Sequence, residues 1–258
     1  MPQYKDQLDR LVIVPELPQR IVSLVPSLTE LLYDLGMGDR VVGLTKFCVH
    51  PDAWWRSKTR VGGTKQLKHA VIASLAPDLI LANKEENIRE DVEALMPHYP
   101  VWVSDVHDLS EALEMIRSVG ELTESQSRAR ALADEIEASF EALTQTKPQR
   151  VLYLIWQEPW MSAGRGTFID DMLQRSGYVN AVTATRYPVM TDEEIVALRP
   201  EIVMLSSEPF PFQEKHLERM QALLPNSRVL LVDGEMYSWY GSRLRLSAAY
   251  FESIVSGH

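Results

Sequence analysis

The chain has 258 residues, with 26 Lys and Arg, 36 Asp and Glu and a single cysteine. Its 45% hydrophobic and 24% charged content is that of a globular protein, which excludes a disordered or fibrous chain. The net charge of -10 argues against nucleic-acid binding, which needs a basic surface. One cysteine cannot form an internal disulfide or an all-cysteine zinc site, so the composition indicates a cysteine-poor, acidic protein of one or two domains.

The start of the sequence carries no targeting signal. Residues 1–6 are polar, and no apolar run of signal-peptide length follows them. No later stretch reaches the roughly 18 apolar residues that a membrane-spanning helix needs. On these features alone we expect a cytoplasmic protein, unless a signal segment precedes residue 1.

Short apolar runs separated by helical patterns occur in both halves of the chain. They are apolar on both faces, as expected for parallel strands covered by helices on each side. We predict an α/β fold of two Rossmann-like lobes with parallel sheets. The predicted strands are residues 21–25, 41–44, 79–82 and 101–103, then 151–155, 202–205 and 229–232.

Two patterns occur once in each half. Residues 75–82 (LAPDLILA) resemble residues 198–205 (LRPEIVML), each reading as a helix end, a proline, an acidic residue and a strand. Residues 94–105 and 222–233 form a second pair. The repeats predict an N-terminal lobe at 1–107 and a C-terminal lobe at 149–258. Between them, residues 108–148 are expected to be connecting helices, including a stiff backbone helix at 124–145.

Cys48 and His50 lie two residues apart, a spacing at which a thiolate and an imidazole can bind one soft metal ion. The same residues also fit a structural role, with Cys48 as a small buried side chain and His50 in a loop before Pro51. The sequence leaves both interpretations open.

Aromatic residues concentrate in segments that follow predicted strands. In open α/β sheets ligands bind at the carboxyl ends of strands, so aromatic side chains there favour an apolar ligand wall over ordinary core packing. Arginines in the same segments can bind ligand carboxylates or phosphates, or form surface ion pairs. These candidates are Trp54, Trp156, Trp160, Arg165, Arg186, Tyr187, Tyr237, Trp239, Tyr240 and Arg243.

Acidic residues follow one predicted strand in each half. Glu86 comes after strand 79–82, and Glu208 and Glu214 come after strand 202–205. Such a pair of carboxylates suits docking to a partner that presents arginines, although single exposed glutamates are usually only solvated.

The segment 20–32 (RIVSLVPSLTELL), followed by Leu35-Gly36 and by Val41-Val42-Gly43, resembles the opening of the class III periplasmic binding proteins. These are the substrate-binding components of ABC importers for cobalamin, haem and ferric siderophores. Residues 75–80 match as well, and the resemblance extends over about residues 4–254. It implies two lobes joined by a backbone helix, a ligand between the lobes, an ABC permease as partner and a periplasmic location.

The chain is most similar to the vitamin B12-binding branch. This resemblance implies ligand contacts from Phe47, His50 and Met236, in addition to Trp160, Tyr237, Trp239 and Tyr240. It also adds Glu90 to Glu86, Glu208 and Glu214 as candidate docking carboxylates, one from each lobe. Where cobalamin binders often carry a tryptophan, this chain has Gly63-Thr64-Lys65, which leaves haem, another corrinoid or an iron chelate as further ligands.

The sequence therefore predicts a monomeric, non-enzymatic binding protein for cobalamin, haem or a ferric siderophore, with no covalent cofactor and no nucleic-acid partner. Burial of a macrocycle by several aromatic side chains would supply the affinity. The alternative is a two-lobed metal-dependent enzyme, a chelatase or hydrolase, in which Cys48 and His50 hold the metal and Glu158 is the general base.

Overall fold

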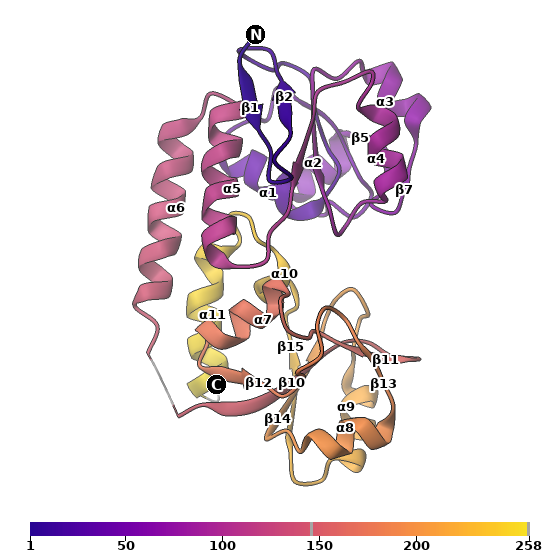
Figure 1. Ribbon diagram of the computed structural model, residues 1–258, viewed down its shortest axis with the longest axis vertical. Helices are drawn as coiled ribbons and strands as arrows, with labels where there is room; N and C mark the ends of the chain where they lie inside the picture. The colour runs from indigo at the N-terminus through magenta and orange to yellow at the C-terminus, as the bar shows by residue number, and fades with distance from the viewer. Residues whose placement is uncertain (145–146, 257–258) are drawn as a thin grey trace. The chain divides into compact units, whose positions relative to one another are not determined.

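The computed structural model describes residues 1–144 and 147–256, and it divides into two compact units (Figure 1). The first comprises residues 1–106, 110–137 and 240–245, and the second comprises residues 107–109, 138–239 and 246–258. The predicted connecting segment, 108–148, is thus divided between the two units. No helix in the described parts of the chain is long and apolar enough to cross a bilayer.

The first unit is built on a sheet of five parallel strands in the order β5-β4-β3-β8-β9. Its strand β8 is buried at every position, which explains the continuous apolar sequence. The strands are β3 (Ile21–Ser23), β4 (Val41–Leu44), β5 (Thr59–Arg60), β8 (Leu79–Asn83) and β9 (Val101–Ser104). The helices are α1 (Pro26–Asp34), α2 (Asp52–Ser57), α3 (His69–Leu75), α4 (Arg89–Leu95), α5 (Leu109–Leu122) and α6 (Gln126–Glu141), and a small hairpin pairs β6 (Gly62–Gly63) with β7 (Gln66–Leu67).

The second unit contains a mixed sheet in the order β13-β11-β10-β14-β15, with β12 also paired to β10. The predicted strands pair in parallel, and β11 and β13 add antiparallel edge strands that the sequence pattern did not predict. The strands are β10 (Gln149–Trp156), β11 (Trp160–Ser162), β12 (Tyr178–Asn180), β13 (Val189–Met190), β14 (Ile202–Ser206) and β15 (Arg228–Val232). The helices are α7 (Phe168–Arg175), α8 (Asp192–Leu198), α9 (Glu214–Leu223), α10 (Glu235–Ser238) and α11 (Leu244–Ser256).

The repeated sequence pattern has the same structure in both units. Helices α3 and α8 each end at a residue with left-handed backbone, Ala76 (φ 42°) and Arg199 (φ 47°), followed by a proline. The acidic residue after the proline then accepts a hydrogen bond from the backbone of the neighbouring strand segment. Asp78 Oδ1 lies 2.8 Å from the amide nitrogen of Arg20, and Glu201 Oε2 lies 2.8 Å from that of Arg150.

The predicted backbone helix at 124–145 is shorter in the structure. Helix α6 covers Gln126–Glu141, which corresponds to about 24 Å at 1.5 Å per residue. It cannot begin at Glu124, because that residue has a left-handed backbone (φ 53°) in the turn after α5. The predicted end at residue 145 lies outside the described residues.

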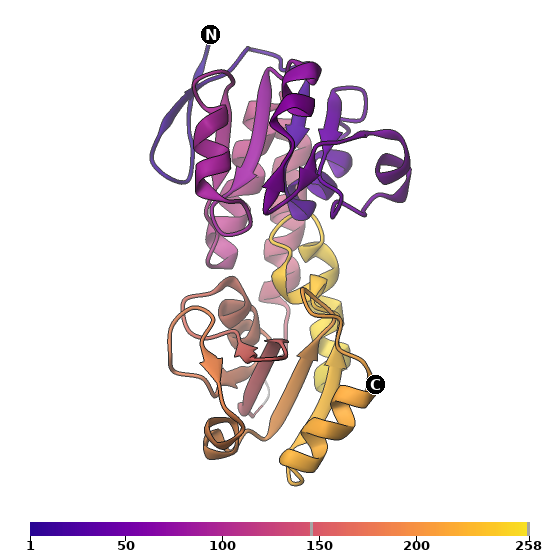
Figure 2. The same cartoon turned by 90° about the vertical axis from the view of Figure 1, so that its right-hand side faces the viewer.

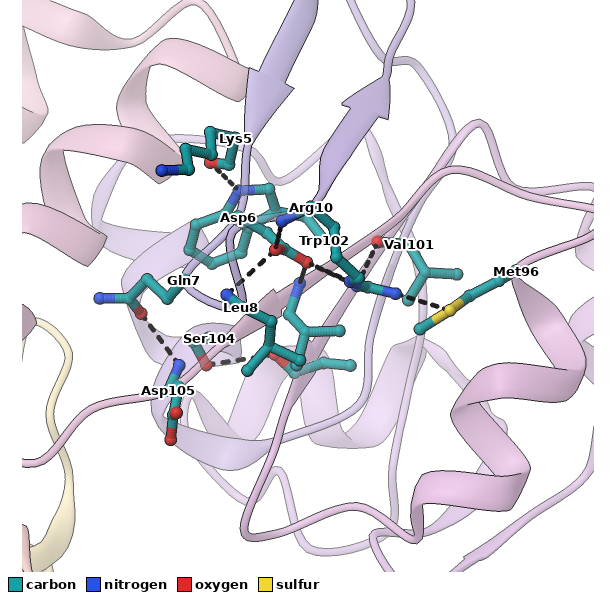
Figure 3. Close-up of polar contacts among 12 residues, drawn as sticks. Lys5, Asp6, Gln7, Leu8, Arg10, Met96, Val101, Trp102, Ser104 and Asp105 are labelled. Carbon is teal, nitrogen blue, oxygen red and sulfur yellow. Dashed lines mark hydrogen bonds and ion pairs between the residues drawn. The ribbon is translucent and has the colours of Figure 1, made fainter.

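A hairpin of β1 (Gln3–Lys5) and β2 (Leu11–Ile13) lies at one side of the first unit, beside strand β9 (Figure 2). Its turn is organised by the buried carboxylate of Asp6 (Figure 3). That carboxylate accepts hydrogen bonds from the backbone amides of Leu8 and Arg10 and from the Arg10 guanidinium, at 2.5–3.0 Å. It also lies 3.4 Å from the amide nitrogen of Val103 in β9, so one side chain joins the hairpin to the sheet edge.

We predict that Asp6→Ala lowers the free energy of unfolding by about 3 kcal/mol, because the change leaves buried donors and the Arg10 charge without their acceptor. Urea denaturation measures the effect. Glu93→Ala is the matched control, since the Glu93 side chain is 50% exposed and forms a surface ion pair with Arg89; it should cost less than about 1 kcal/mol. Equal effects of the two substitutions would contradict this role for Asp6.

Candidate functional site

Buried polar side chains gather at the carboxyl ends of the parallel strands in the first unit. Asn83, the last residue of β8, donates from Nδ2 to the carbonyl and hydroxyl oxygens of Ser104 at 3.2 and 3.1 Å. Its Oδ1 accepts hydrogen bonds from the amides of Glu85 and Glu86 at 2.8 and 3.0 Å. Asn87 accepts in turn from the Asn83 amide at 2.9 Å. These asparagines therefore determine the shape of the turn that carries Glu86.

The short segment 240–245 packs against this turn and against α1, far away in sequence. The Tyr240 hydroxyl donates to Glu86 Oε1 at 3.1 Å, and burial together with the nearby Glu86 carboxylate raises the pKa of Tyr240 well above its usual value. Gly241 permits the close approach, since a Cβ at this position would lie only 2.5 Å from the carbonyl oxygen of Ser27. Tyr240, a predicted ligand contact, is thus held inside the first unit.

Arg243 forms a paired ion contact with Glu30 of α1. Its Nε lies 2.9 Å from Oε2 and its Nη2 lies 2.5 Å from Oε1, and the two side chains are only 10% and 17% exposed. A guanidinium that already has a buried carboxylate partner does not need an anionic ligand. This placement does not fit the prediction that Arg243 contacts the ligand.

The segment after β4 carries three of the predicted ligand residues in different surroundings. Phe47 is 50% exposed and His50 is half-buried. Trp54 is only 6% exposed, because its ring packs edge-on against Tyr33 of α1 with 5.3 Å between the ring centroids. The structure therefore places Trp54 in the packing between α1 and α2, and of these three residues Phe47 has the most accessible side chain.

Cys48 does not have the environment of a metal ligand. Its side chain is completely buried, Sγ lies 3.1 Å from the Thr45 hydroxyl, and burial raises the pKa of the thiol to about 11. Metals bind the thiolate, which this burial disfavours. Among the described residues no group of three His, Cys, Asp or Glu side chains could hold a metal ion. These observations oppose the metal site predicted at Cys48 and His50.

An aromatic cluster lies in the segments after β10 and β14 of the second unit. Trp156 contacts Phe210 edge-on at 5.5 Å between centroids, and Phe210 contacts Phe212 at 4.8 Å. Phe212 stacks on Trp160 at 6.3 Å with an interplanar angle of 10°. His216 of α9 completes the cluster, 5.3 Å from Phe210 and 5.5 Å from Phe212. Trp156 is 39% exposed, so this cluster presents aromatic surface to solvent.

The structure brings Arg165 and Arg186 together. Their backbones are joined by a hydrogen bond from the Arg186 amide to the Arg165 carbonyl at 3.0 Å, and both residues are exposed. Tyr187 lies beside them, with its ring centroid 5.8 Å from the Arg186 guanidinium. Two adjacent arginines can bind a carboxylate or phosphate group, so this pair keeps the chemistry that the sequence suggested.

Residues of helix α10 and its neighbourhood are mostly structural. Tyr237 is fully buried between Tyr153 and Phe251, with ring centroids at 5.2 and 4.5 Å, which does not fit its predicted contact with a ligand. Met236 is half-buried, and its carbonyl accepts a hydrogen bond from Ser247. Trp239 is 6% exposed and donates from Nε1 to Glu208 at 3.0 Å.

The four candidate docking carboxylates fall into two pairs. Glu86 and Glu208 are half-buried and hydrogen-bonded, Glu86 to Tyr240 and Glu208 to Ser238 and Trp239; burial raises the pKa of Glu208. Glu90 and Glu214 are exposed, each in the first turn of the helix that follows the equivalent strand, α4 after β8 and α9 after β14. Only the second pair is presented on the surface.

A groove of about 450 Å³ lies in the first unit, lined by Arg10, by strand β2 and by residues 96–101. None of the predicted ligand residues lines it, so it lies apart from the candidate site.

The family model described as periplasmic binding protein matches residues 21–228. The chain belongs to this family. An uncharacterized ABC transporter substrate-binding lipoprotein of Bacillus subtilis (strain 168) is 27% identical, over 93% of this chain and 80% of the relative. A vitamin B12-binding protein of Vibrio parahaemolyticus is 24% identical, over 76% of this chain and 74% of the relative.

Among solved structures of similar fold is a periplasmic haem-binding protein from Roseiflexus sp. RS-1 in its apo form, with a TM-score of 0.77. It is 22% identical, and the match covers 91% of this chain and 98% of that one. The family resemblance seen in the sequence is thereby confirmed, and the two-lobed α/β fold with it.

Several residues of this periplasmic binding protein's candidate site were missed by sequence reasoning. Asn83 comes directly after a predicted strand, so a polar residue ending an apolar run was the available signal for it; Asn87 lies four residues further on. His216 joins the aromatic cluster from within a helix pattern, and nothing in its sequence neighbours marks it.

We predict that Cys48 in the native protein reacts with Ellman's reagent at least roughly 100-fold more slowly than in the urea-unfolded chain, because the thiol is buried and protonated. The absorbance of the released thiolate measures the reaction, and the unfolded chain is the control. Rapid native labelling, or stoichiometric zinc that is lost in Cys48→Ala, would restore the metal-site hypothesis.

Proposed function

We propose that this protein is the substrate-binding component of an ABC importer and that its ligand is a metal chelate, in first place a corrinoid such as cobalamin. The observation that carries the proposal is the partly exposed aromatic cluster at the carboxyl ends of β10 and β14. Membership of the periplasmic binding protein family and the functions for which the relatives are named support it.

The chemistry of the cluster suits a large, flat ligand. Trp156 offers an exposed indole supported by Phe210, and behind it Phe212 and Trp160 stack to form a rigid base. Arg219 packs over Trp160 with its guanidinium 4.9 Å from the ring centroid, which holds that base in place. Aromatic rings contribute dispersion and apolar burial to a macrocycle without demanding one hydrogen-bond pattern. Haem and ferric siderophores share these features and remain alternative ligands.

The adjacent Arg165 and Arg186 supply positive charge on the same unit. Cobalamin carries a phosphate and haem carries carboxylates, and guanidinium groups recognise both kinds of anion. We propose that this pair and the aromatic cluster together replace the predicted contacts of Arg243 and Tyr237, whose side chains are engaged within their own units.

The proposed function is to bind the ligand without carrying out a chemical reaction. We propose that the ligand is released unchanged and that no covalent cofactor takes part. The alternative hypothesis of a metal-dependent enzyme lacks support, because it needs a Cys48 thiolate as metal ligand. The Cys48 side chain is buried, and burial raises the pKa of its thiol. Recovery of unaltered ligand after incubation, checked by mass spectrometry, tests this part.

We propose that the protein acts as a monomer. We also propose that it lies outside the cytoplasmic membrane, because an importer collects its ligand there. Sedimentation equilibrium measures the oligomeric state. Cell fractionation with an antibody against the chain measures the location, and recovery in the cytoplasmic fraction would contradict the proposal.

Docking to the permease is proposed for Glu90 and Glu214. Each is exposed at the start of a helix that follows the equivalent strand in its unit, so the two carboxylates have matching local positions. Exposed carboxylates can pair with arginines of a partner and mainly increase specificity and association rate. Glu86 and Glu208 instead serve internal hydrogen bonds.

We predict that the chain binds cyanocobalamin in isothermal titration and that Trp156→Ala weakens the binding on the order of tenfold, because a partly exposed indole loses its contact with the ligand. Trp55→Ala is a matched control, since the two indoles are 39% and 38% exposed, and it should leave the affinity unchanged.

The same titration is repeated with haemin and ferrichrome. If haemin or ferrichrome binds and cyanocobalamin does not, that compound replaces cobalamin as the proposed ligand, which is still a metal chelate. Heat from none of the three, or equal effects of the two tryptophan substitutions, would contradict the proposed site.

We predict that Glu90→Lys and Glu214→Lys each weaken binding to the cognate ABC permease in detergent, because a lysine repels the arginines expected on the partner. Surface plasmon resonance in low and high salt measures the change, which should be mostly in the association rate. Glu93→Lys serves as the control, because Glu93 is an exposed glutamate on α4 that pairs with Arg89. An equal loss for the control would show only a general charge effect.

A further inference from the structure

Strand β2 of the hairpin leaves one of its edges open. The amide of Asp6 donates to the carbonyl of Arg10 at 2.9 Å, which marks a hydrogen-bonded pair of the antiparallel ladder. Bonded and non-bonded pairs alternate along such a ladder, so Val12 also bonds to β1, whereas the amides and carbonyls of Leu11 and Ile13 point away from it. Among the residues that the structure describes, β1 is the only strand paired with β2. The open edge therefore offers two amides and two carbonyls to a further strand.

The side chains of the same two residues are exposed and apolar. Leu11 is 69% and Ile13 is 52% exposed, while Val12 between them is only 8% exposed, because alternate side chains of a strand point to opposite faces. Natural proteins usually protect exposed strand edges with charged side chains or proline. Strand β2 carries neither, so its edge is suited to pairing with another extended chain.

The open edge borders the groove of about 450 Å³, whose other wall is residues 96–101. Arg10 joins the two walls, since Nη1 lies 2.6 Å from the Met96 sulfur and Nη2 lies 3.3 Å from the Val101 carbonyl oxygen (Figure 3). Residues 96–100 come immediately before β9, so the groove lies at the amino end of that strand. The candidate ligand residues follow the carboxyl ends of strands, which sets the groove apart from them.

The lining of the groove indicates an uncharged occupant. None of its residues is Asp or Glu, and its basic residues are Arg10 and His98. The Arg10 guanidinium is paired with the buried carboxylate of Asp6 at 2.9 Å, which compensates its charge. An anionic partner such as a nucleic acid or an acidic lipid surface would need several uncompensated cations. The open backbone groups instead match an extended peptide with apolar side chains.

A second copy of the chain fits this edge less well. Strand β2 (Leu11–Ile13) spans only about 10 Å at about 3.3 Å per residue, so pairing two such strands gives few contacts. Stable interfaces bury about 800 Å² on each partner. The hairpin of a second copy would also bring its own groove wall, residues 96–101, against the first. A single extended segment of another protein avoids both problems.

We infer that this groove binds an extended, uncharged apolar segment of a partner protein, which joins the hairpin as a third strand. The backbone groups of Leu11 and Ile13 supply the hydrogen bonds, and the exposed side chains of the same residues supply apolar contact. This goes beyond the proposed import function, which uses residues after the carboxyl ends of strands, and it does not depend on which ligand is transported.

The test begins with the selection of random decapeptides on the full chain by phage display. We expect peptides in which apolar residues alternate and charged residues are rare. A selected peptide is then synthesised and added during hydrogen exchange measured by NMR. The amides of Leu11 and Ile13 should exchange more slowly with the peptide bound. The Val12 amide is the internal control, because it is already bonded to β1 and should not change.

Two proline variants test the backbone contact by calorimetric titration with the same peptide. Ile13→Pro removes an amide on the open edge and no bond to β1, so it should weaken the peptide about tenfold. Gln3→Pro is the matched control, because Gln3 lies opposite Ile13 in β1 and its amide points to the other edge of the hairpin. It should leave the affinity unchanged.

A second pair of variants keeps every amide and tests the side chain, in case the proline disturbs the hairpin. Ile13→Ala should weaken the peptide about threefold. Val189→Ala is the control, since it shortens a 57% exposed side chain of edge strand β13 in the second unit. Failure to select any peptide, equal effects within both pairs, or unchanged exchange at Leu11 and Ile13 would overturn the inference. So would self-association of the chain that Ile13→Pro abolishes, which would assign the edge to a second copy.

Discussion

In each unit a carboxylate just before one parallel strand accepts a hydrogen bond from a backbone amide near the start of the strand beside it. Asp78 does this for Arg20 and Glu201 does it for Arg150, both at 2.8 Å. Each follows a helix that ends in a left-handed residue and a proline, a stop that needs no further helical hydrogen bond. The tether sets where β3 meets β8 and where β10 meets β14. The positions of the carboxyl ends of these strands, and of every candidate site residue that follows them, depend on that register.

The segments after those carboxyl ends differ between the units. In the first unit the strand ends carry Ser23, Asn83 and Ser104, and the hydrogen bonds of Asn83 organise a turn with Glu86. In the second unit the strand ends lead into aromatic residues that pack on one another and leave Trp156 accessible. Hydrogen bonds between polar groups dominate the first arrangement, whereas packing of aromatic rings dominates the second. The same backbone plan therefore carries a hydrogen-bonded polar turn on one unit and a partly exposed aromatic surface on the other.

The charged residues also divide into an exposed group and a buried, paired group. The exposed group includes two glutamates at the starts of α4 and α9. The buried carboxylate of Asp6 and the half-buried carboxylate of Glu30, by contrast, are paired with Arg10 and Arg243. Removing a carboxylate from water without a charged partner would cost several kcal/mol, so these two ion pairs stabilise the fold. The exposed charged side chains, by contrast, are accessible to partners.

The sequence by itself determined the fold class, the repeated helix–proline–acid–strand pattern and the family, because apolar periodicity and turn residues act over short distances in the chain. It could not separate site residues from core residues of the same type. Tyr237 and Trp156 are both aromatic and both lie near strand ends, yet one is fully buried and the other 39% exposed. Arg243 and Arg165 look alike in sequence, but Arg243 forms an ion pair with Glu30, which lies 213 residues away in the chain. Only the tertiary structure decided these roles, since burial and ion pairing depend on side chains that the chain brings together from distant positions.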